Sequence, residues 1–156
     1  MRNAFKLGLI AVLATAALPG AAQNSSANPN YQTITLNSGF TPDPNVINLQ
    51  AGGSIAASSA AGGCQGFITN APDVRLHYNA GSLPLIISVA SGSDTTLVIN
   101  APDGSWYCDD DGGNNGSNPA VRFNSPRSGR YEIWIGTYSA GSLQSAQLHI
   151  SEIYSQ

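Results

Sequence analysis

The chain has 156 residues, which is room for one ordinary domain, and only 10% of them are charged. Its formal net charge is −3, and without residues 1–22 the four arginines and nine acids that remain give a formal charge of −5. This balance makes nucleic acid a poor partner. The apolar residues are grouped into short runs rather than diluted, which argues against a disordered chain.

The sequence begins like a secretory signal peptide. Arg2 and Lys6 precede an apolar run at residues 7–18, and small residues follow it. The run is too short to span a hydrocarbon core, which needs about 20 residues, and no later run is longer. We therefore predict a signal peptide at residues 1–22 that is cleaved near Ala22. The mature chain would be secreted or held at the cell surface, with the periplasm as a further destination.

The rest of the sequence is typical of β-strands. Residues 23–32 lack apolar periodicity and are predicted to be a flexible leader. Beyond them, short runs with a period of two are separated by Gly, Pro, Asn and Asp clusters, and we find no amphipathic helical stripe of useful length. The runs lie at residues 31–36, 45–50, 65–68, 73–78, 84–90, 94–100, 129–136 and 145–150. About eight strands or more within about 125 residues predict an all-β fold, an antiparallel β-sandwich of jelly-roll type, over residues 33–156.

The alternation also predicts which side chains face the core. Residues 84–90 and 94–100 are apolar on both faces and are expected to form central strands. In three other runs one face is apolar: Val74, Leu76 and Tyr78; Tyr131, Ile133 and Ile135; Ala146, Leu148 and Ile150.

The chain contains two cysteines, Cys64 and Cys108. An oxidising compartment favours their pairing over free thiols or metal thiolates. A bridge would close a loop of about 45 residues and stabilise the fold by up to about 4 kcal/mol in the chain-entropy model. The alternative is two buried free thiols.

An acidic loop follows the second cysteine, where WYCDDDGGNNGSNP contains Asp109, Asp110 and Asp111. Five of the nine acids lie between Arg75 and Arg122, an interval without a basic residue. Adjacent carboxylates at about 5 Å repel each other by somewhat under 1 kcal/mol in water, and by more where solvent is excluded. A Ca²⁺ ion would relieve this repulsion, because it binds carboxylate, amide and backbone oxygens in a flexible geometry. The glycines and asparagines supply turns that let backbone oxygens face inward.

A polar turn with solvated aspartates would explain the same residues. The loop also fails the EF-hand pattern, because Gly113 and Ala120 stand where that pattern needs ligands. Softer metals are disfavoured, since neither histidine is near this segment. The calcium hypothesis depends on the uncompensated charge and on Asp94, which opens a strand that would neighbour the loop.

Several motifs taken together point to a known family. The stretches GFTPDPNVINLQAGG, CQGFITNAPDVRLHY, SDTTLVINAPDGSWYCDDD, NPAVRF and SGRYEIWIGTY resemble the bacterial pre-peptidase C-terminal (PPC) type domain in its short secreted form. The resemblance covers about residues 33–152. It implies a jelly-roll β-sandwich, calcium in many members, and a non-catalytic role beside exported enzymes, in secretion, processing or substrate attachment.

The resemblance also implies site residues. Asp94 matches the Asp that opens the family's Asp-Thr-Leu strand, and Asp110 with Asp111 matches its Asp pair. Asp109 and Asn118 join the predicted Ca²⁺ ligands because they flank that pair. Cys64 and Cys108 fall at the two positions of the family's bridge.

Catalysis is not predicted. The stretch GTYSAG around Ser139 begins with Thr137 where a nucleophile elbow requires Gly, and its setting is not strand-turn-helix. His77 and His149 each occupy the polar face of a strand. Neighbouring aspartates in one loop do not straddle a glycosidic bond, so we predict no catalytic residue.

Binding is harder to dismiss. Trp134 lies on the face opposite Tyr131, so an exposed indole there would offer a platform for sugar rings or a protein partner, with Tyr107 and Tyr138 nearby. The alternative is that a loop or the edge of a second sheet covers Trp134. Trp106 is expected to pack near the disulfide.

The sequence thus predicts a secreted, non-catalytic, calcium-stabilised β-sandwich that acts as a binding or accessory module. Its partners would be an extracellular protein, a polysaccharide or copies of itself. The alternative is a structural subunit of an extracellular filament or surface layer. There the first strand, YQTITL, would be donated to the sheet of a neighbour.

Overall fold

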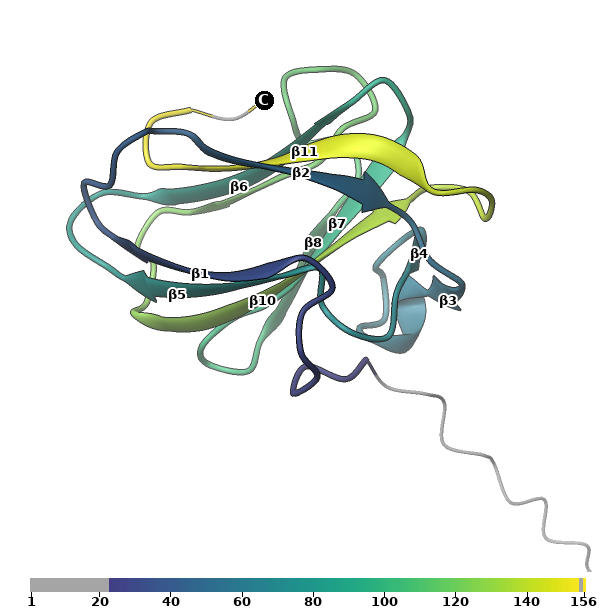
Figure 1. Ribbon diagram of the computed structural model, residues 1–156, viewed down its shortest axis with the longest axis horizontal. Coiled ribbons are helices and arrows are strands. Elements are labelled where there is room, and N and C mark those ends of the chain that lie inside the picture. Colours follow the sequence, from purple (N-terminus) through teal and green to yellow (C-terminus); the bar gives the residue numbers. More distant parts are fainter. Residues whose placement is uncertain (1–22, 155) are drawn as a thin grey trace, which may run out of the picture.

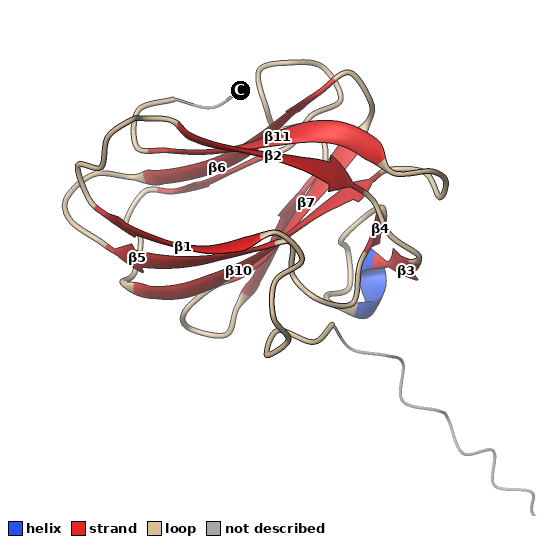
Figure 2. Cartoon of the chain, viewed as in Figure 1, coloured by secondary structure: helices blue, strands red, loops and turns tan. Residues whose placement is uncertain are grey.

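The structure is a computed structural model that describes residues 23–154 and 156. The signal peptide predicted for residues 1–22 lies outside the described residues. Within them the chain forms eleven strands and one short 3-10 helix (Figure 2). None of the helical structure in this part of the chain is long and apolar enough to cross a membrane.

The elements follow one another as β1 (Gln32–Asn37), β2 (Asn45–Ala51), β3 (Ile55–Ala56), η1 (Ala57–Ser59), β4 (Phe67–Ile68), β5 (Val74–Asn79), β6 (Leu85–Ser91), β7 (Thr95–Asn100), β8 (Trp106–Asp109), β9 (Ala120–Phe123), β10 (Gly129–Thr137) and β11 (Gln144–Ser151).

These strands form two sheets that face each other (Figure 1). The smaller sheet has the order β2-β11-β6-β9. In the larger sheet β10 is central: β5 and then β4 pair along one edge, β7 pairs along the other, β1 lies outside β5, and β8 lies outside β7. Only the β1–β5 pair is parallel among the described strands. The predicted all-β sandwich of antiparallel strands is therefore confirmed.

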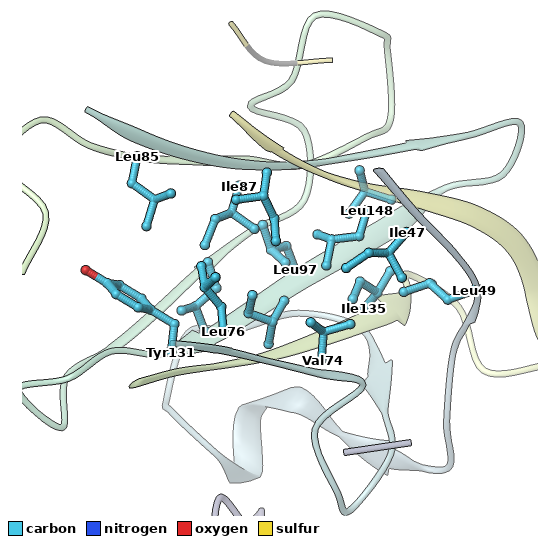
Figure 3. Packing of buried hydrophobic residues seen from close by; sticks show 14 of the residues in the cluster. Ile47, Leu49, Val74, Leu76, Leu85, Ile87, Leu97, Tyr131, Ile135 and Leu148 are labelled. Carbon is cyan, nitrogen blue, oxygen red and sulfur yellow. The ribbon is translucent and has the colours of Figure 1, made fainter. Parts of the chain in front are cut away.

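The core lies between the sheets and contains the side chains that the alternation selected. Residues from both layers interdigitate in Figure 3, among them Val74, Leu76, Ile135 and Leu148. All nine side chains predicted to face inward from β5, β10 and β11 belong to this cluster. The central position of β6 and β7, inferred from their apolar character on both faces, is also confirmed. Burial of one such aliphatic side chain contributes about 1.5–3 kcal/mol.

The segment predicted to be a flexible leader is instead attached to the larger sheet. Asn24 N–H donates to Asn70 O (3.0 Å), and the Arg75 guanidinium donates to Ala27 O (2.7 Å). Tyr31 N–H continues the series by donating to Asp73 O (3.0 Å). These contacts use backbone groups, so a sequence without apolar periodicity does not reveal them.

A buried carboxylate fills a gap beside β10. The strand pairs with β5 as far as Ile133 and meets β4 only at Thr137. Between these points the Asp73 side chain, 1% exposed, accepts a hydrogen bond from Ile135 N–H (2.8 Å) and another from Asn30 Nδ2 (2.9 Å). Burial raises the pKa of Asp73 to about 6, although both hydrogen bonds lower it.

The raised pKa predicts how Asp73 affects stability. Because the folded-state pKa of about 6 exceeds the ordinary 3.8, the stabilisation from this group is complete below pH 3.8 and is lost as the pH rises through 6. Asp73→Asn removes the titration and keeps an acceptor for Ile135 N–H. We expect the free energy of unfolding of wild type, relative to this variant, to fall by up to about 3 kcal/mol from acid to neutral pH. Urea unfolding across this pH range measures it. A constant difference would contradict the assignment.

Candidate functional site

The two cysteines form the predicted disulfide, with their Cα atoms 5.6 Å apart. Cys64 lies in a segment that we call the outer flap (residues 55–68, which contain β3, η1 and β4), and Cys108 lies on β8. The bridge therefore fastens the outer flap to the edge of the larger sheet, on the face turned away from the core.

The outer flap covers Trp134. The indole is fully buried in a second apolar cluster with Cys64, Ile68 and Val98, and the Trp106 ring lies against it at a centroid distance of 5.4 Å. This corrects the prediction of Trp134 as a binding platform, because the covering segment assumed in the alternative is present. Trp106 packs beside the disulfide, as expected.

A glycine permits this close covering. A Cβ atom at Gly136 would lie 2.4 Å from Thr96 Oγ1 and 2.7 Å from Phe67 O, so any side chain there would push the outer flap away from β10.

The two tyrosines predicted beside Trp134 are exposed but far apart. Tyr107 is 37% exposed and packs edge-on against Phe123 at a centroid distance of 4.9 Å. Tyr138 is 42% exposed, and its N–H donates to Asp94 O just before β7 begins. Because Tyr107 pairs with Ile99 near the end of β7, the two rings lie at opposite ends of that strand. They do not form a single patch.

Two of the predicted Ca²⁺ ligands shape the acidic loop. Asp109 Oδ2 accepts hydrogen bonds from Gly112 N–H (2.6 Å) and Ala120 N–H (2.9 Å), which closes the loop at its base. Asn118 is 5% exposed, and its Oδ1 accepts from the Thr95 hydroxyl at 2.8 Å. Both side chains therefore join the loop to the ends of β7 and β9.

The other three predicted ligands share one electrostatic environment. Burial raises the pKa of Asp94, and the charges of Asp111 and then Asp110 raise it further. Asp110 Oδ2 also accepts from Gln65 Nε2 of the outer flap at 3.0 Å. Carboxylates from two loops thus repel each other at this end of the sandwich.

No arginine of the described chain reaches these three carboxylates. Each arginine has another partner. Arg75 and Arg130 form ion pairs with Glu132, Arg127 forms one with Asp103, and Arg122 donates a hydrogen bond to Asn124.

The donor set suits a hard cation without being assembled as a metal centre. Asp94, Asp110 and Asp111 offer carboxylate oxygens, and a hollow of about 330 Å³ beside Asp94 is lined by hydroxyl, amide and backbone groups of residues 91–94 and 115–118. Across residues 23–154 and 156, however, no three His, Cys, Asp or Glu side chains are close enough to hold an ion. A bound ion would have to draw the carboxylates inward and complete its shell with backbone oxygens and water.

Comparison with known proteins gives distant similarities to solved structures, among them a collagenase domain and a lysozyme inhibitor. No family model matches the chain, and no curated protein sequence matches it. The pre-peptidase C-terminal domain of a collagenase from Bacillus anthracis is 15% identical, covers 80% of this chain and 100% of its own, and has a TM-score of 0.46. PliG, a periplasmic inhibitor of g-type lysozyme from Aeromonas hydrophila, is 16% identical, covers 77% and 96%, and has a TM-score of 0.37.

The covered indole gives a test of the disulfide. In the double variant Cys64→Ser, Cys108→Ser we expect the free energy of unfolding to fall by up to about 4 kcal/mol, because the unfolded chain loses its cross-link. The outer flap should also open locally, so acrylamide should quench tryptophan fluorescence more strongly below the unfolding transition. Unchanged quenching and stability would mean that packing alone holds the outer flap.

Proposed function

We propose that the chain is an exported, non-catalytic binding or accessory module whose acidic loop is stabilised by Ca²⁺. The observation that supports the calcium part is the position of Asp94 within electrostatic reach of Asp110 and Asp111, with no basic side chain paired to any of the three in the described residues. The PPC resemblance assigns the same three aspartates to calcium.

Asp94, Asp110 and Asp111 would supply the charged ligands. A Ca²⁺ ion there contributes a divalent positive charge that offsets their mutual repulsion. Asp94 precedes β7, whereas the other two follow β8, so one ion would connect the two ends of this hairpin. Asp109 and Asn118 would act as supports, since their hydrogen bonds already fix the loop that carries the ligands.

The side-chain chemistry supports a non-catalytic role. Both imidazole nitrogens of His149 are buried without a hydrogen-bond partner among the described residues, and burial lowers its pKa. Ser139 lies in the turn after β10, where its carbonyl accepts from the Thr137 hydroxyl at 3.0 Å. A serine nucleophile needs a base within hydrogen-bond reach. The His149 imidazole makes no hydrogen bond to Ser139 or to any other described residue, so it does not act as that base.

Thermal unfolding with and without calcium tests the metal site. Wild type should melt several degrees higher in Ca²⁺ than in EDTA, because an ion that binds only the folded state stabilises it by mass action. Asp110→Asn should lose most of this difference and should melt at or slightly above wild type in EDTA, because the substitution removes one of the repelling charges. Asp103→Asn is the matched control. Asp103 lies outside the group of three aspartates and pairs with Arg127 instead. Equal melting of wild type with and without calcium would refute the metal site.

The position of β1 favours a second candidate, a subunit that polymerises by strand donation. Among the described strands β1 pairs only with β5, at the edge of the larger sheet, and its side chains are exposed or half-buried. The same strand of a neighbouring molecule would fit that edge equally well.

A cross-link separates the two candidates. Thr35 and His77 are exposed register partners on β1 and β5, so an oxidised Thr35→Cys, His77→Cys variant would hold β1 in its own sheet. If strand donation occurs, this variant should stay monomeric in size-exclusion chromatography where wild type forms polymers. Polymers of undiminished size in the oxidised variant, or a monomeric wild type, would exclude strand donation.

A further inference from the structure

The outer face of the smaller sheet carries a polar groove. Along β2 and β11, which lie side by side in Figure 1, outward positions form transverse rows because their register is fixed. One row pairs Asn48 with Gln147, and the next pairs Gln50 with Ser145. All four side chains are exposed, so this face presents amides and hydroxyls to solvent.

Small residues on β6 make the face concave. Gln147 is opposite Ala90, and Gly92 follows directly after β6 ends. β9 pairs with β6 only as far as Ser88, so Asn115 of the acidic loop, rather than a strand, lines the groove beyond it. The resulting hollow has a volume of about 730 Å³, and none of its lining residues is charged.

The amides are held in place and keep unused hydrogen-bonding atoms. Gln147 Nε2 donates to Asn48 Oδ1 (2.9 Å), and Gln50 Nε2 donates to Ser145 Oγ (3.2 Å). Among the described residues this leaves Asn48 Nδ2 as a free donor and the Oε1 atoms of Gln147 and Gln50 as free acceptors. The groove thus offers both a free donor and free acceptors, which matches a ligand whose hydroxyls donate and accept.

An anchored aromatic ring stands at one end of the groove. The Tyr31 hydroxyl accepts from Gln50 N–H (2.8 Å) and donates to Gln50 O (3.3 Å). Its side chain remains 42% exposed, and no other aromatic ring of the described chain packs against it. A ring fixed at its hydroxyl end offers apolar area to a ligand at little cost in conformational entropy.

We infer that this groove binds an extended neutral oligosaccharide. The inference rests on the binding-module function proposed above and names the class of its ligand. Anionic ligands would find no cation in the groove, and an apolar protein surface would leave the free amide atoms unpaired. Sugar hydroxyls would satisfy those atoms, and the apolar face of a pyranose ring would pack on Tyr31.

Calorimetric titration of the calcium-loaded protein tests the groove, with cellohexaose, chitohexaose and xylohexaose as neutral probes and a hexamer of polygalacturonate as the anionic control. We expect at least one neutral probe to bind with a Kd below about 1 mM, and the anionic hexamer to bind at least about tenfold more weakly. Gln147→Ala and Ala90→Gln should each weaken binding at least about tenfold, the first by removing a free acceptor and the second by filling the floor. Gln32→Ala is the matched control, because Gln32 is an exposed residue of the other sheet without a side-chain hydrogen bond in the described chain.

The outcomes separate this inference from the proposed function. Binding of no neutral probe by a protein that still melts higher in calcium would overturn the groove and leave the calcium-stabilised module standing. Neutral-probe binding that both groove variants retain would place the ligand elsewhere and also overturn it. Tighter binding of the anionic hexamer than of the neutral probes would contradict the ligand class. So would a protein that binds no probe but self-associates, if Ala90→Gln abolishes that self-association.

Discussion

The hydrogen bond from Ile135 N–H to the buried Asp73 carboxylate is the constraint on which the arrangement of the larger sheet depends. It occupies the part of the β10 edge that neither β5 nor β4 covers. Burial of a carboxylate costs several kcal/mol, and the two donors offset part of that cost. Because the Ile135 N–H has a hydrogen-bond partner, β10 can pair with β5 at one end of this edge and with β4 of the outer flap at the other. The outer flap in turn covers Trp134.

The core was predictable from the sequence, whereas the covering of the sheet faces was not. A period of two distinguishes the inward from the outward residues of β5, β10 and β11, because a strand turns successive side chains to opposite faces. It cannot show what lies over an outward residue such as Trp134. That residue is covered by a segment about 70 residues earlier in the chain, whose apolar side chains are mostly small and which is held by a disulfide. The attachment of residues 23–31 escaped prediction for a related reason, since it depends on hydrogen bonds rather than on apolar side chains.

The candidate sites were likewise predictable from the sequence only in part. The charge imbalance of the acidic loop is visible in the sequence, but the separate roles of its residues depend on which oxygen atoms meet backbone N–H groups. The resemblance already set Asp94, Asp110 and Asp111 apart from the flanking Asp109 and Asn118, but it did not reveal that Asp109 and Asn118 close the loop through hydrogen bonds. The polar groove needs the register of three strands, because Ala90 forms a floor only when amides flank it on β11 and β2.

The contact between Tyr31 and Gln50 also affects how molecules meet at high concentration. β2 is an outer strand of its sheet, and such strands expose unpaired amide and carbonyl groups that can nucleate edge-to-edge aggregation. The Tyr31 hydroxyl satisfies both groups of Gln50, and Gly52 N–H donates to Ile135 O (2.9 Å). The remaining open stretch, around Val46 and Asn48, is shorter than an ordinary strand and provides little template for a neighbouring chain. A chain with few charges thereby gains protection against edge-to-edge association from a single phenol group.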